Sequence, residues 1–211
     1  MTDILIFDFD GVLADTRQFM LHTVGEVCSQ LGYPCTPTPA DLEALEAMSF
    51  DNIGRQLGIP EEKISEFSLR NILASNTYPE PMPAFDGIDQ IVLQLAGRSR
   101  LGLITGNGGG VVRTYLAYYG LKECFEMVLS LEDPGSRVEK IWRILEGLGN
   151  GRGQAYMIGD AVSDIHAARH AGITSVAVAW GHQSLAKLRQ AGPDFLIEKP
   201  SDLLTIFPPD L

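Results

Sequence analysis

Residues 4–11 read Ile-Leu-Ile-Phe-Asp-Phe-Asp-Gly, an apolar run that ends in two aspartates. Four consecutive apolar residues without polar alternation are typical of a strand that is covered on both faces of a parallel sheet. Because side chains alternate along an extended chain, Asp8 and Asp10 are expected on one side while the two phenylalanines pack on the other. The segment therefore predicts a buried strand with a pair of carboxylates at its carboxyl end.

Short apolar runs of the same kind recur along the chain. They lie at residues 101–105, 127–131, 155–159 and 175–179. Apolar residues at helical spacing fill the segments between them. Repeated alternation of strand and helix predicts an α/β fold, a doubly wound parallel (Rossmann-like) sheet whose ligand crevice lies at the carboxyl ends of its strands.

One long segment interrupts this alternation. From residue 16 the chain offers several helical stretches and no convincing strand until about residue 100. The stretch Pro79-Glu80-Pro81-Met82-Pro83 then places three prolines within five residues, which is typical of a stiff connector. We therefore expect an all-helical cap at residues 16–82, inserted into an α/β core that consists of residues 1–15 and 83–211.

Polar side chains follow three of the predicted strands. Thr105 ends the second apolar run, and Asp160 and Asp164 follow the run at residues 155–159. Because parallel strands deliver their carboxyl ends to one edge of a sheet, these side chains are expected to meet Asp8 and Asp10 there. Carboxylates so crowded raise one another's pKa or require a cation, and Mg²⁺ is the usual oxygen-preferring ion.

The glycine-rich stretch at residues 106–110 follows Thr105 directly. Its backbone N–H groups are suited to binding a phosphate. We expect Gly106 and Asn107 to contact the substrate because they come next to the hydroxyl. For residues 108–110 a flexible entry into a helix is an equally good interpretation.

Other polar or aromatic side chains give weaker signals. The four histidines show no metal-ligand pairing and are expected in structural or surface positions: His22, His166, His170 and His182. Within the insertion, three polar residues face either the substrate or solvent: Ser49, Asn52 and Arg55. Trp180 follows the last apolar run and is expected to be a packed loop aromatic.

The charge balance limits the classes of partner. Lys+Arg 16 against Asp+Glu 27 gives a formal net charge of −11, the wrong sign for binding nucleic acid or an anionic membrane. The start Met1-Thr2-Asp3 lacks a basic export region, and no apolar run is long enough to span a bilayer. Three cysteines without a CxxC pair indicate a reducing compartment rather than a disulfide framework. We therefore expect a cytoplasmic protein with free thiols.

Three segments carry a family resemblance. FDFDGVLADT (residues 7–16), LITGN (103–107) and IGDAVSDIHAARHAGI (158–173) resemble the signature motifs of the haloacid dehalogenase superfamily. The helical insertion after the first motif resembles the family's helical cap. It places the chain nearest the phosphoglycolate phosphatase-like and β-phosphoglucomutase-like members.

The resemblance implies roles for these residues. Asp8 is the expected nucleophile, which forms an aspartyl-phosphate, and Asp10 is the expected general acid and then base. Thr105 corresponds to the catalytic hydroxyl of the second motif. Mg²⁺ is expected on the Asp8 carboxylate, the Asp10 backbone carbonyl and Asp160, with Asp164 binding it directly or orienting its ligands.

The family's phosphoryl-binding basic residue has no clear match here. Residues 132–141 read Glu-Asp-Pro-Gly-Ser-Arg-Val-Glu-Lys-Ile and lack the Lys-Pro pair of many relatives. Aligning this residue four and seven positions before the apolar helix residues Ile141 and Ile144 selects Arg137. Its guanidinium at a helix start suits phosphoryl oxygens. Lys140 is the rival, although a solvated helix charge is the more ordinary interpretation of it.

Together these observations predict an Mg²⁺-dependent phosphatase of a small phosphorylated metabolite, phosphoglycolate-like, without nucleic-acid or membrane partners. The main alternative is a β-phosphoglucomutase-like phosphomutase, which uses the same acids. A haloacid dehalogenase is less favoured because such enzymes generally lack an acid at the position of Asp10. A phospho-acceptor signalling protein is disfavoured by Asp10 and the long insertion. The sequence leaves the exact substrate and the oligomeric state open.

Overall fold

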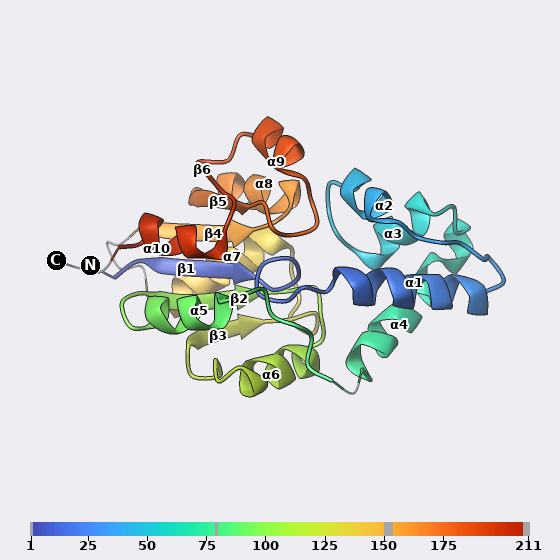
Figure 1. Cartoon of the computed structure of the whole chain (residues 1–211), viewed down its shortest axis with the longest axis horizontal. Helices are drawn as coiled ribbons and strands as arrows, with labels where there is room; N and C mark the ends of the chain where they lie inside the picture. Colours follow the sequence, from blue (N-terminus) through green and yellow to red (C-terminus); the bar gives the residue numbers. More distant parts are fainter. Residues whose placement is uncertain (1, 79, 150–153, 209–211) are drawn as a thin grey trace.

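The computed structural model describes residues 2–78, 80–149 and 154–208. Its centre is a six-stranded sheet in the order β3-β2-β1-β4-β5-β6, in which every neighbouring pair is parallel (Figure 1). The strands are β1 (Ile4–Asp8), β2 (Arg100–Ile104), β3 (Phe125–Leu129), β4 (Ala155–Gly159), β5 (Thr174–Val178) and β6 (Phe195–Ile197). This topology confirms the predicted doubly wound α/β fold.

Two details of the sheet differ from the sequence prediction. The strand expected at residues 127–131 is β3, which begins two residues earlier, at Phe125. The edge strand β6 was not predicted. Three residues that pair only with β5 are too short to produce a recognisable apolar pattern.

Side chains of β1 alternate between two apolar cores, as the period of an extended chain requires. Leu5 and Phe7 belong to the core under α5, α6 and α10. Ile4 and Ile6 belong to the core under α7 and α8. These helices, with α9 and a short 3-10 turn, span α5 (Ile88–Ala96), α6 (Gly109–Tyr118), α7 (Arg137–Gly147), α8 (Val162–Ala171), α9 (Leu185–Ala191), η1 (Pro200–Asp202) and α10 (Leu203–Ile206).

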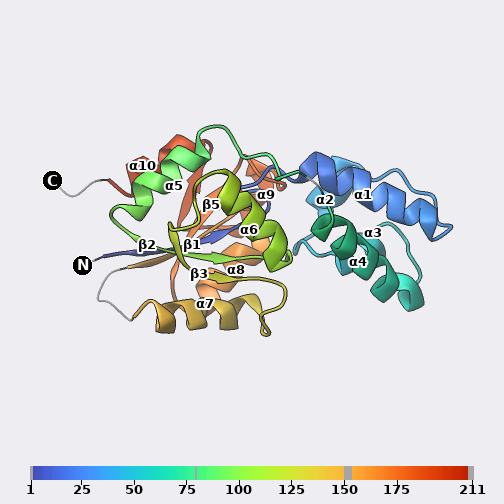
Figure 2. The same cartoon turned by 90° about the horizontal axis from the view of Figure 1, so that it is seen from below.

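Four further helices form a separate unit beside the sheet: α1 (Arg17–Gln30), α2 (Pro39–Ala44), α3 (Phe50–Gln56) and α4 (Glu61–Asn76). Figures 1 and 2 show them grouped at one end of the molecule, beyond the carboxyl ends of the strands. They share an apolar core of their own, which includes Val24, Leu42, Ile53 and Phe67. The expected boundaries of this unit, residues 16 and 82, stay a prediction; we call it the cap.

The two connectors between cap and sheet run side by side. The Asp15 N–H donates to the Pro83 carbonyl at 2.8 Å, and Ala14 and Ala84 form an antiparallel bridge. Of the proline-rich connector predicted from sequence, Pro79 lies outside the described residues. The paired connectors fix the point at which the cap leaves the end of β1.

The cap contains a disulfide between Cys28 and Cys35, whose Cα atoms are 6.0 Å apart. The expectation of three free thiols was therefore wrong; Cys124 alone is free. Sequence spacing gave no sign of the pair because contact depends on the turn after α1, where Gly32 adopts a positive φ of 79° and sends the chain back toward the helix. The bond ties the end of α1 to the segment that leads into α2.

No helix in the part of the chain that the structure describes has the length and apolar character needed to cross a membrane.

One buried hydrogen bond offers a test of how the sheet holds the start of the cap. The Tyr115 hydroxyl, on the fully buried face of α6, donates to the Leu13 carbonyl at 2.7 Å. Tyr115→Phe removes this bond and leaves the carbonyl with the Phe85 N–H as its remaining donor, so we expect the free energy of unfolding, measured by urea denaturation, to fall by about 0.5–1.5 kcal/mol. The control is Tyr118→Phe on the same helix, where the ring is 69% exposed, and it should change little. Equal effects of both substitutions would contradict this account.

Candidate active site

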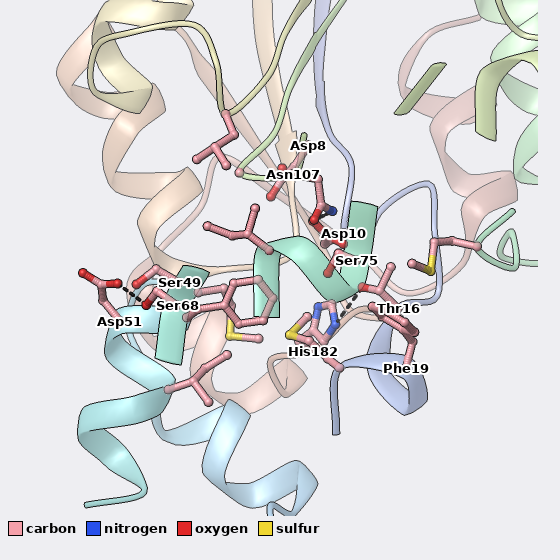
Figure 3. A pocket seen from close by; sticks show the side chains of 18 of the residues that line it. Asp8, Asp10, Thr16, Phe19, Ser49, Asp51, Ser68, Ser75, Asn107 and His182 are labelled. Atoms are coloured by element: carbon pink, nitrogen blue, oxygen red, sulfur yellow. Dashed lines mark hydrogen bonds between the residues drawn. The ribbon is translucent and has the colours of Figure 1, made fainter. Parts of the chain in front are cut away.

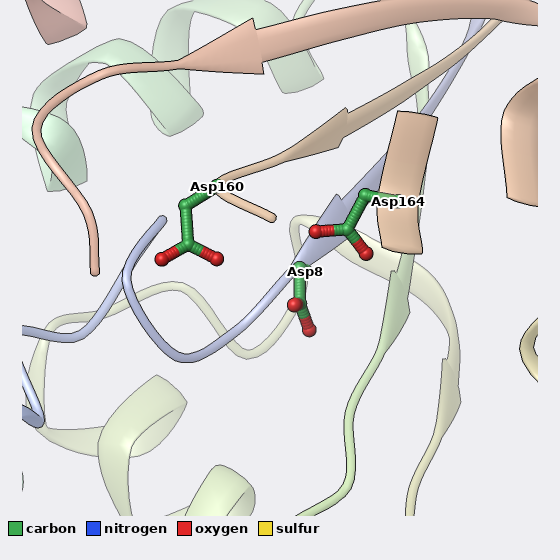
Figure 4. Close-up of side chains that lie close together, drawn as sticks. All are labelled: Asp8, Asp160 and Asp164. Atoms are coloured by element: carbon green, nitrogen blue, oxygen red, sulfur yellow. The ribbon is translucent and has the colours of Figure 1, made fainter. Parts of the chain in front are cut away.

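Three buried carboxylates meet at the carboxyl edge of the sheet. Asp8 ends β1, Asp160 follows the neighbouring strand β4, and Asp164 lies in the first turn of α8. Each offers an oxygen within 4.8 Å of the others. Figure 4 shows the three side chains close together. Parallel pairing of β1 with β4 places the first two side by side, as predicted from the strand ends.

Close packing around these acids requires glycine. Gly11 has a positive φ of 74°, and a Cβ at this position would overlap the Asp160 carboxylate and the His182 ring. A side chain at Gly181 would likewise overlap Asp160. The loops after β1 and β5 therefore approach the carboxylates closely because neither carries a side chain there.

Burial dominates the electrostatics of the three acids. It raises the pKa of Asp8 well above its usual value; nearby Arg137 opposes this rise, and the charges of Asp164 and Asp160 add to it. The pKa of Asp164 is raised to about 6, mainly by burial. The site thus holds more negative charge than it stabilises by itself, which is the condition under which a cation binds.

Arg137 supplies the positive charge that the structure places among these acids. It is the first residue of α7, and its Nη1 lies 3.1 Å from Asp8 Oδ2 and also pairs with Asp164 Oδ1. Attraction to these two carboxylates outweighs burial and raises the pKa of the guanidinium further. Ser136 fixes the helix start, because its side chain accepts a hydrogen bond from the Glu139 N–H.

Lys140 does not reach the site. Its Nζ donates to the Ser130 carbonyl at 2.7 Å, and the residue is 7% exposed. Burial lowers the pKa of this amine. The interpretation of Lys140 as a solvated helix charge was therefore wrong, and of the two rivals Arg137 is the one beside Asp8.

Asp10 faces the same space without joining the three clustered acids. The Asn107 side-chain amide donates to Asp10 Oδ2 at 2.7 Å, so the loop after β2 holds this carboxyl. Burial raises the pKa of Asp10. A carboxyl held apart from the cluster and inclined to keep its proton has the properties of a general acid.

Thr105 and the glycine stretch shape the loop after β2. The Thr105 hydroxyl accepts a hydrogen bond from the Asn107 N–H at 2.9 Å, and its side chain is buried. Gly106 and Asn107 line the adjoining cavity. The Gly109 N–H, at the start of α6, donates to the Glu132 carboxylate at 2.9 Å. The Gly109 N–H is therefore bound to a side chain of the protein and is not available to bind a phosphate.

His182 is a site residue that the sequence interpretation missed. It is buried, its Nδ1 lies 2.8 Å from Asp160 Oδ2, and its backbone N–H donates to the same oxygen at 2.6 Å. The hydrogen bond to Asp160 raises the histidine pKa despite burial. A search for paired metal-ligand histidines could not find it, whereas its position just after β5 was a usable signal.

A cavity of about 230 Å³ opens from these acids toward the cap. Figure 3 shows Asp8, Asp10 and Asn107 at its sheet end and Ser49 of the cap at the other. Of the three polar cap residues considered from sequence, Ser49 lines the cavity. Asn52 donates to the Ala47 carbonyl instead, and Arg55 pairs with Glu61 at 2.7 Å.

Hydrogen bonds from the sheet domain hold the cap over this cavity. Gln183 Nε2 and Lys187 Nζ both donate to the Leu45 carbonyl, each at 2.6 Å. Lys187 Nζ also donates to the Glu43 carbonyl, and the Ser163 N–H donates to the Glu46 carbonyl at 3.2 Å. These acceptors lie at and just beyond the end of α2, where carbonyls lack helical partners.

Residues 5–178 match the family described as haloacid dehalogenase-like hydrolase. The chain belongs to this family. The predicted fold and the predicted enzyme class, a haloacid dehalogenase-like phosphoric monoester hydrolase, are confirmed with it.

Two relatives are similar over nearly the whole chain. A phosphoglycolate phosphatase from Synechococcus elongatus is 28% identical over 201 residues, which cover 95% of this chain and 94% of the relative. The pyrophosphatase PpaX from Bacillus velezensis is 29% identical over 217 residues, with 96% and 94% covered.

Solved structures share the fold. A haloacid dehalogenase-like hydrolase from Streptococcus pneumoniae has a TM-score of 0.82 at 21% identity and covers 98% of both chains. A predicted phosphoglycolate phosphatase from Haemophilus somnus has a TM-score of 0.81 at 16% identity, again with 98% of both chains covered. The structure thus places at one sheet edge the acids that the haloacid dehalogenase resemblance singled out, while their catalytic roles stay predictions.

The positions of the two basic residues generate a paired prediction. Arg137→Ala should lower kcat for an aryl phosphate at least about tenfold, because it removes the positive charge beside Asp8. Lys140→Met should change kcat little but should reduce the free energy of unfolding by about 1–3 kcal/mol, since the buried hydrogen bond from the charged amine to the Ser130 carbonyl is lost and the Asp133 N–H alone remains on that oxygen. Steady-state kinetics and urea denaturation of both variants measure these effects. The opposite ranking in kcat would assign the phosphoryl-binding role to Lys140.

Proposed function

We propose that the protein is an Mg²⁺-dependent phosphatase that hydrolyses a small-molecule phosphomonoester through an aspartyl-phosphate on Asp8. The observation that carries the proposal is the placement of Asp8. Its carboxylate lies between the Arg137 guanidinium and two further acids, and it faces a cavity at whose sheet end Asn107 also holds Asp10. This arrangement brings together a nucleophile, a positively charged guanidinium and a general acid.

The residues fit a hard divalent cation. Asp8, Asp160 and Asp164 provide buried carboxylate oxygens at mutual distances compatible with one ion, and the raised pKa values of Asp8 and Asp164 show that their charges are not fully compensated. The Asp10 backbone carbonyl is the further ligand implied by the family resemblance. When bound, Mg²⁺ neutralises charge on the phosphoryl oxygens and on the acids around them.

The first step uses Asp8 and Asp10. A carboxylate oxygen of Asp8 forms a bond to phosphorus while the bond from phosphorus to the substrate oxygen breaks. The leaving oxygen takes the proton of Asp10, whose pKa is raised by burial so that the acid form is favoured. The products of this step are a free alcohol and phosphorylated Asp8.

The second step returns the enzyme to its starting state. Asp10, now ionised, takes a proton from a water molecule whose oxygen bonds to phosphorus, and the bond from phosphorus to Asp8 breaks. Inorganic phosphate leaves. Arg137 stays beside the phosphoryl group throughout, because it pairs with both Asp8 and Asp164 and does not depend on the substrate for its position.

The small cavity supports a metabolite as substrate. Its walls come from both the sheet domain and the cap, and Gln183 and Lys187 hold the cap in place over it. A phosphorylated protein would require the cap to stay open, which would leave Asp10 hydrated. A kinetic comparison of small phosphate esters with a phosphopeptide tests this substrate class, and glucose 1-phosphate with a bisphosphate primer tests for phosphomutase activity.

Replacing the nucleophile gives a direct test. Asp8→Asn should reduce turnover of p-nitrophenyl phosphate below roughly a tenth of the wild-type rate, because an amide does not attack phosphorus yet fills the same space. Mass spectrometry after rapid acid quenching should find a phosphoryl group on Asp8 of the wild type only. Asp15→Asn, an exposed acid in the same segment, is the matched control and should keep full activity. Retained turnover in Asp8→Asn would contradict the assignment of Asp8 as the nucleophile.

Metal removal gives a second test. EDTA should abolish activity and Mg²⁺ should restore it, whereas Ca²⁺ should not because its larger and looser coordination shell disturbs the attack geometry. Asp164→Asn should raise the Mg²⁺ concentration needed for half-maximal activity by roughly tenfold or more. Full activity in the presence of chelator would favour the dehalogenase alternative instead.

A further inference from the structure

We propose that the cap side of the cavity selects a phosphomonoester whose alcohol is mainly apolar and carries no second anionic group, and that Asp51 sets a preference for a hydrogen-bond donor at the far end of that alcohol. The inference rests on the proposed function and specifies its substrate class. On this proposal phosphoglycolate, whose leaving group carries a carboxylate, is a poor substrate.

The walls of the cavity beyond the acids are mainly apolar, although Ser49, Ser68 and Ser75 also line them. The apolar walls come from α1, α3 and α4 of the cap, from the segment between α2 and α3, from the connector after α4 and from the loop after β3. The apolar lining residues are Phe19, Met20, Met48, Phe50, Ile53, Ile72, Met82 and Leu131. Such walls stabilise a hydrocarbon body and give a charged group little replacement for its lost water, because the Ser68 and Ser75 hydroxyls already donate to Asp51 and to the Asn71 carbonyl.

The charges on the described lining residues are unfavourable for a second anion. Four of these residues are aspartates: Asp8, Asp10, Asp51 and Asp160. Arg137 and His182 are the basic side chains among them, and both lie at the sheet end. Arg137 pairs with Asp8 and Asp164, and His182 pairs with Asp160. Both basic side chains that line the cavity are therefore already paired with the acids at the sheet end.

The cap provides no cation for the far end. Its lysines and arginines are Arg17, Arg55, Lys63 and Arg70. Each has a partner in the structure: the Gly181 carbonyl for Arg17, Glu61 for Arg55, and Glu66 for the other two. None of the four is among the described residues that line the cavity. An anionic leaving group would enter this space without a counter-ion, next to an existing carboxylate.

Asp51 marks the far end of the cavity, where the residue is also exposed to solvent. Figure 3 shows it with Ser49 and Ser68, away from Asp8 and Asp10. The Ser68 hydroxyl donates to Asp51 Oδ1 and fixes the carboxylate, while Oδ2 takes no part in that bond. A carboxylate held at the end of an apolar passage accepts hydrogen bonds from a hydroxyl or an ammonium group.

A matched substrate series tests the proposal with the whole protein and Mg²⁺. The series consists of pentyl phosphate, 5-hydroxypentyl phosphate, 5-aminopentyl phosphate and 4-carboxybutyl phosphate, which are nearly equal in length. We expect kcat/KM for the carboxyl ester to be at least about tenfold below that for pentyl phosphate, and the amino ester to be at least as good as pentyl phosphate.

Substitutions at Asp51 test whether this residue sets the preference between the amino and carboxyl esters. Asp51→Asn should shrink the ratio of kcat/KM between the amino and carboxyl esters at least about fivefold, and Asp51→Lys should invert the preference, because the charge at the far end changes sign. Glu62→Gln, an exposed acid at the start of α4 outside the cavity lining, is the control and should leave the wild-type ratio unchanged. Circular dichroism verifies that each variant is folded.

The outcomes separate the two proposals. Absence of turnover of all four esters and of p-nitrophenyl phosphate would overturn the proposed function. Turnover with the carboxyl ester equal to or better than pentyl phosphate would overturn the specificity inference and leave the phosphatase assignment standing. Discrimination against the carboxyl ester that persists unchanged in Asp51→Lys would overturn the part assigned to Asp51.

Discussion

The burial of several like charges at one point is the constraint on which the rest of the structure depends. Asp8, Asp160 and Asp164 each offer a carboxylate oxygen within 4.8 Å of the others, in a place where burial is the main cause that raises the pKa of Asp8 and Asp164. Such a cluster is unfavourable unless its members are held rigidly and compensated. Two neighbouring strands and the first turns of α7 and α8 each contribute one group, so the sheet edge provides the rigidity and Arg137 part of the compensation.

The sheet domain and the cap have different roles, the first in the reaction and the second in recognition of the leaving group. The sheet domain holds the reacting groups, whose positions follow from strand ends and helix starts. The cap has its own apolar core and lines the opposite side of the cavity, so its residues vary the environment of the leaving group without disturbing the acids. Lys187 and Gln183 join the two parts at the Leu45 carbonyl, just after the end of α2. Recognition therefore depends on how the cap is seated as well as on which residues it carries.

The sequence could predict those site residues whose position follows directly from the end of a strand or the start of a helix. Asp8 and Asp160 lie at or next to strand ends, so the apolar runs were enough to bring them together. Arg137 was also within reach, because Ser136 and Glu139 mark the helix start that places it. By contrast, the disulfide of Cys28 and the cavity depend on how far loops fold back after their elements end. No local pattern contains that information.

The position of β1 has a consequence for the order in which the chain folds. This strand is central in the sheet, yet its neighbours begin at Arg100 and Ala155, so the apolar start of the chain leaves the ribosome long before either partner exists. The helices of the cap, with their own core, are complete by Asn76. During synthesis from the N-terminus the cap can therefore fold first, while β1 still lacks the strands β2 and β4 with which it pairs. A delay in making residues 77–104 would prolong the exposure of an aggregation-prone strand.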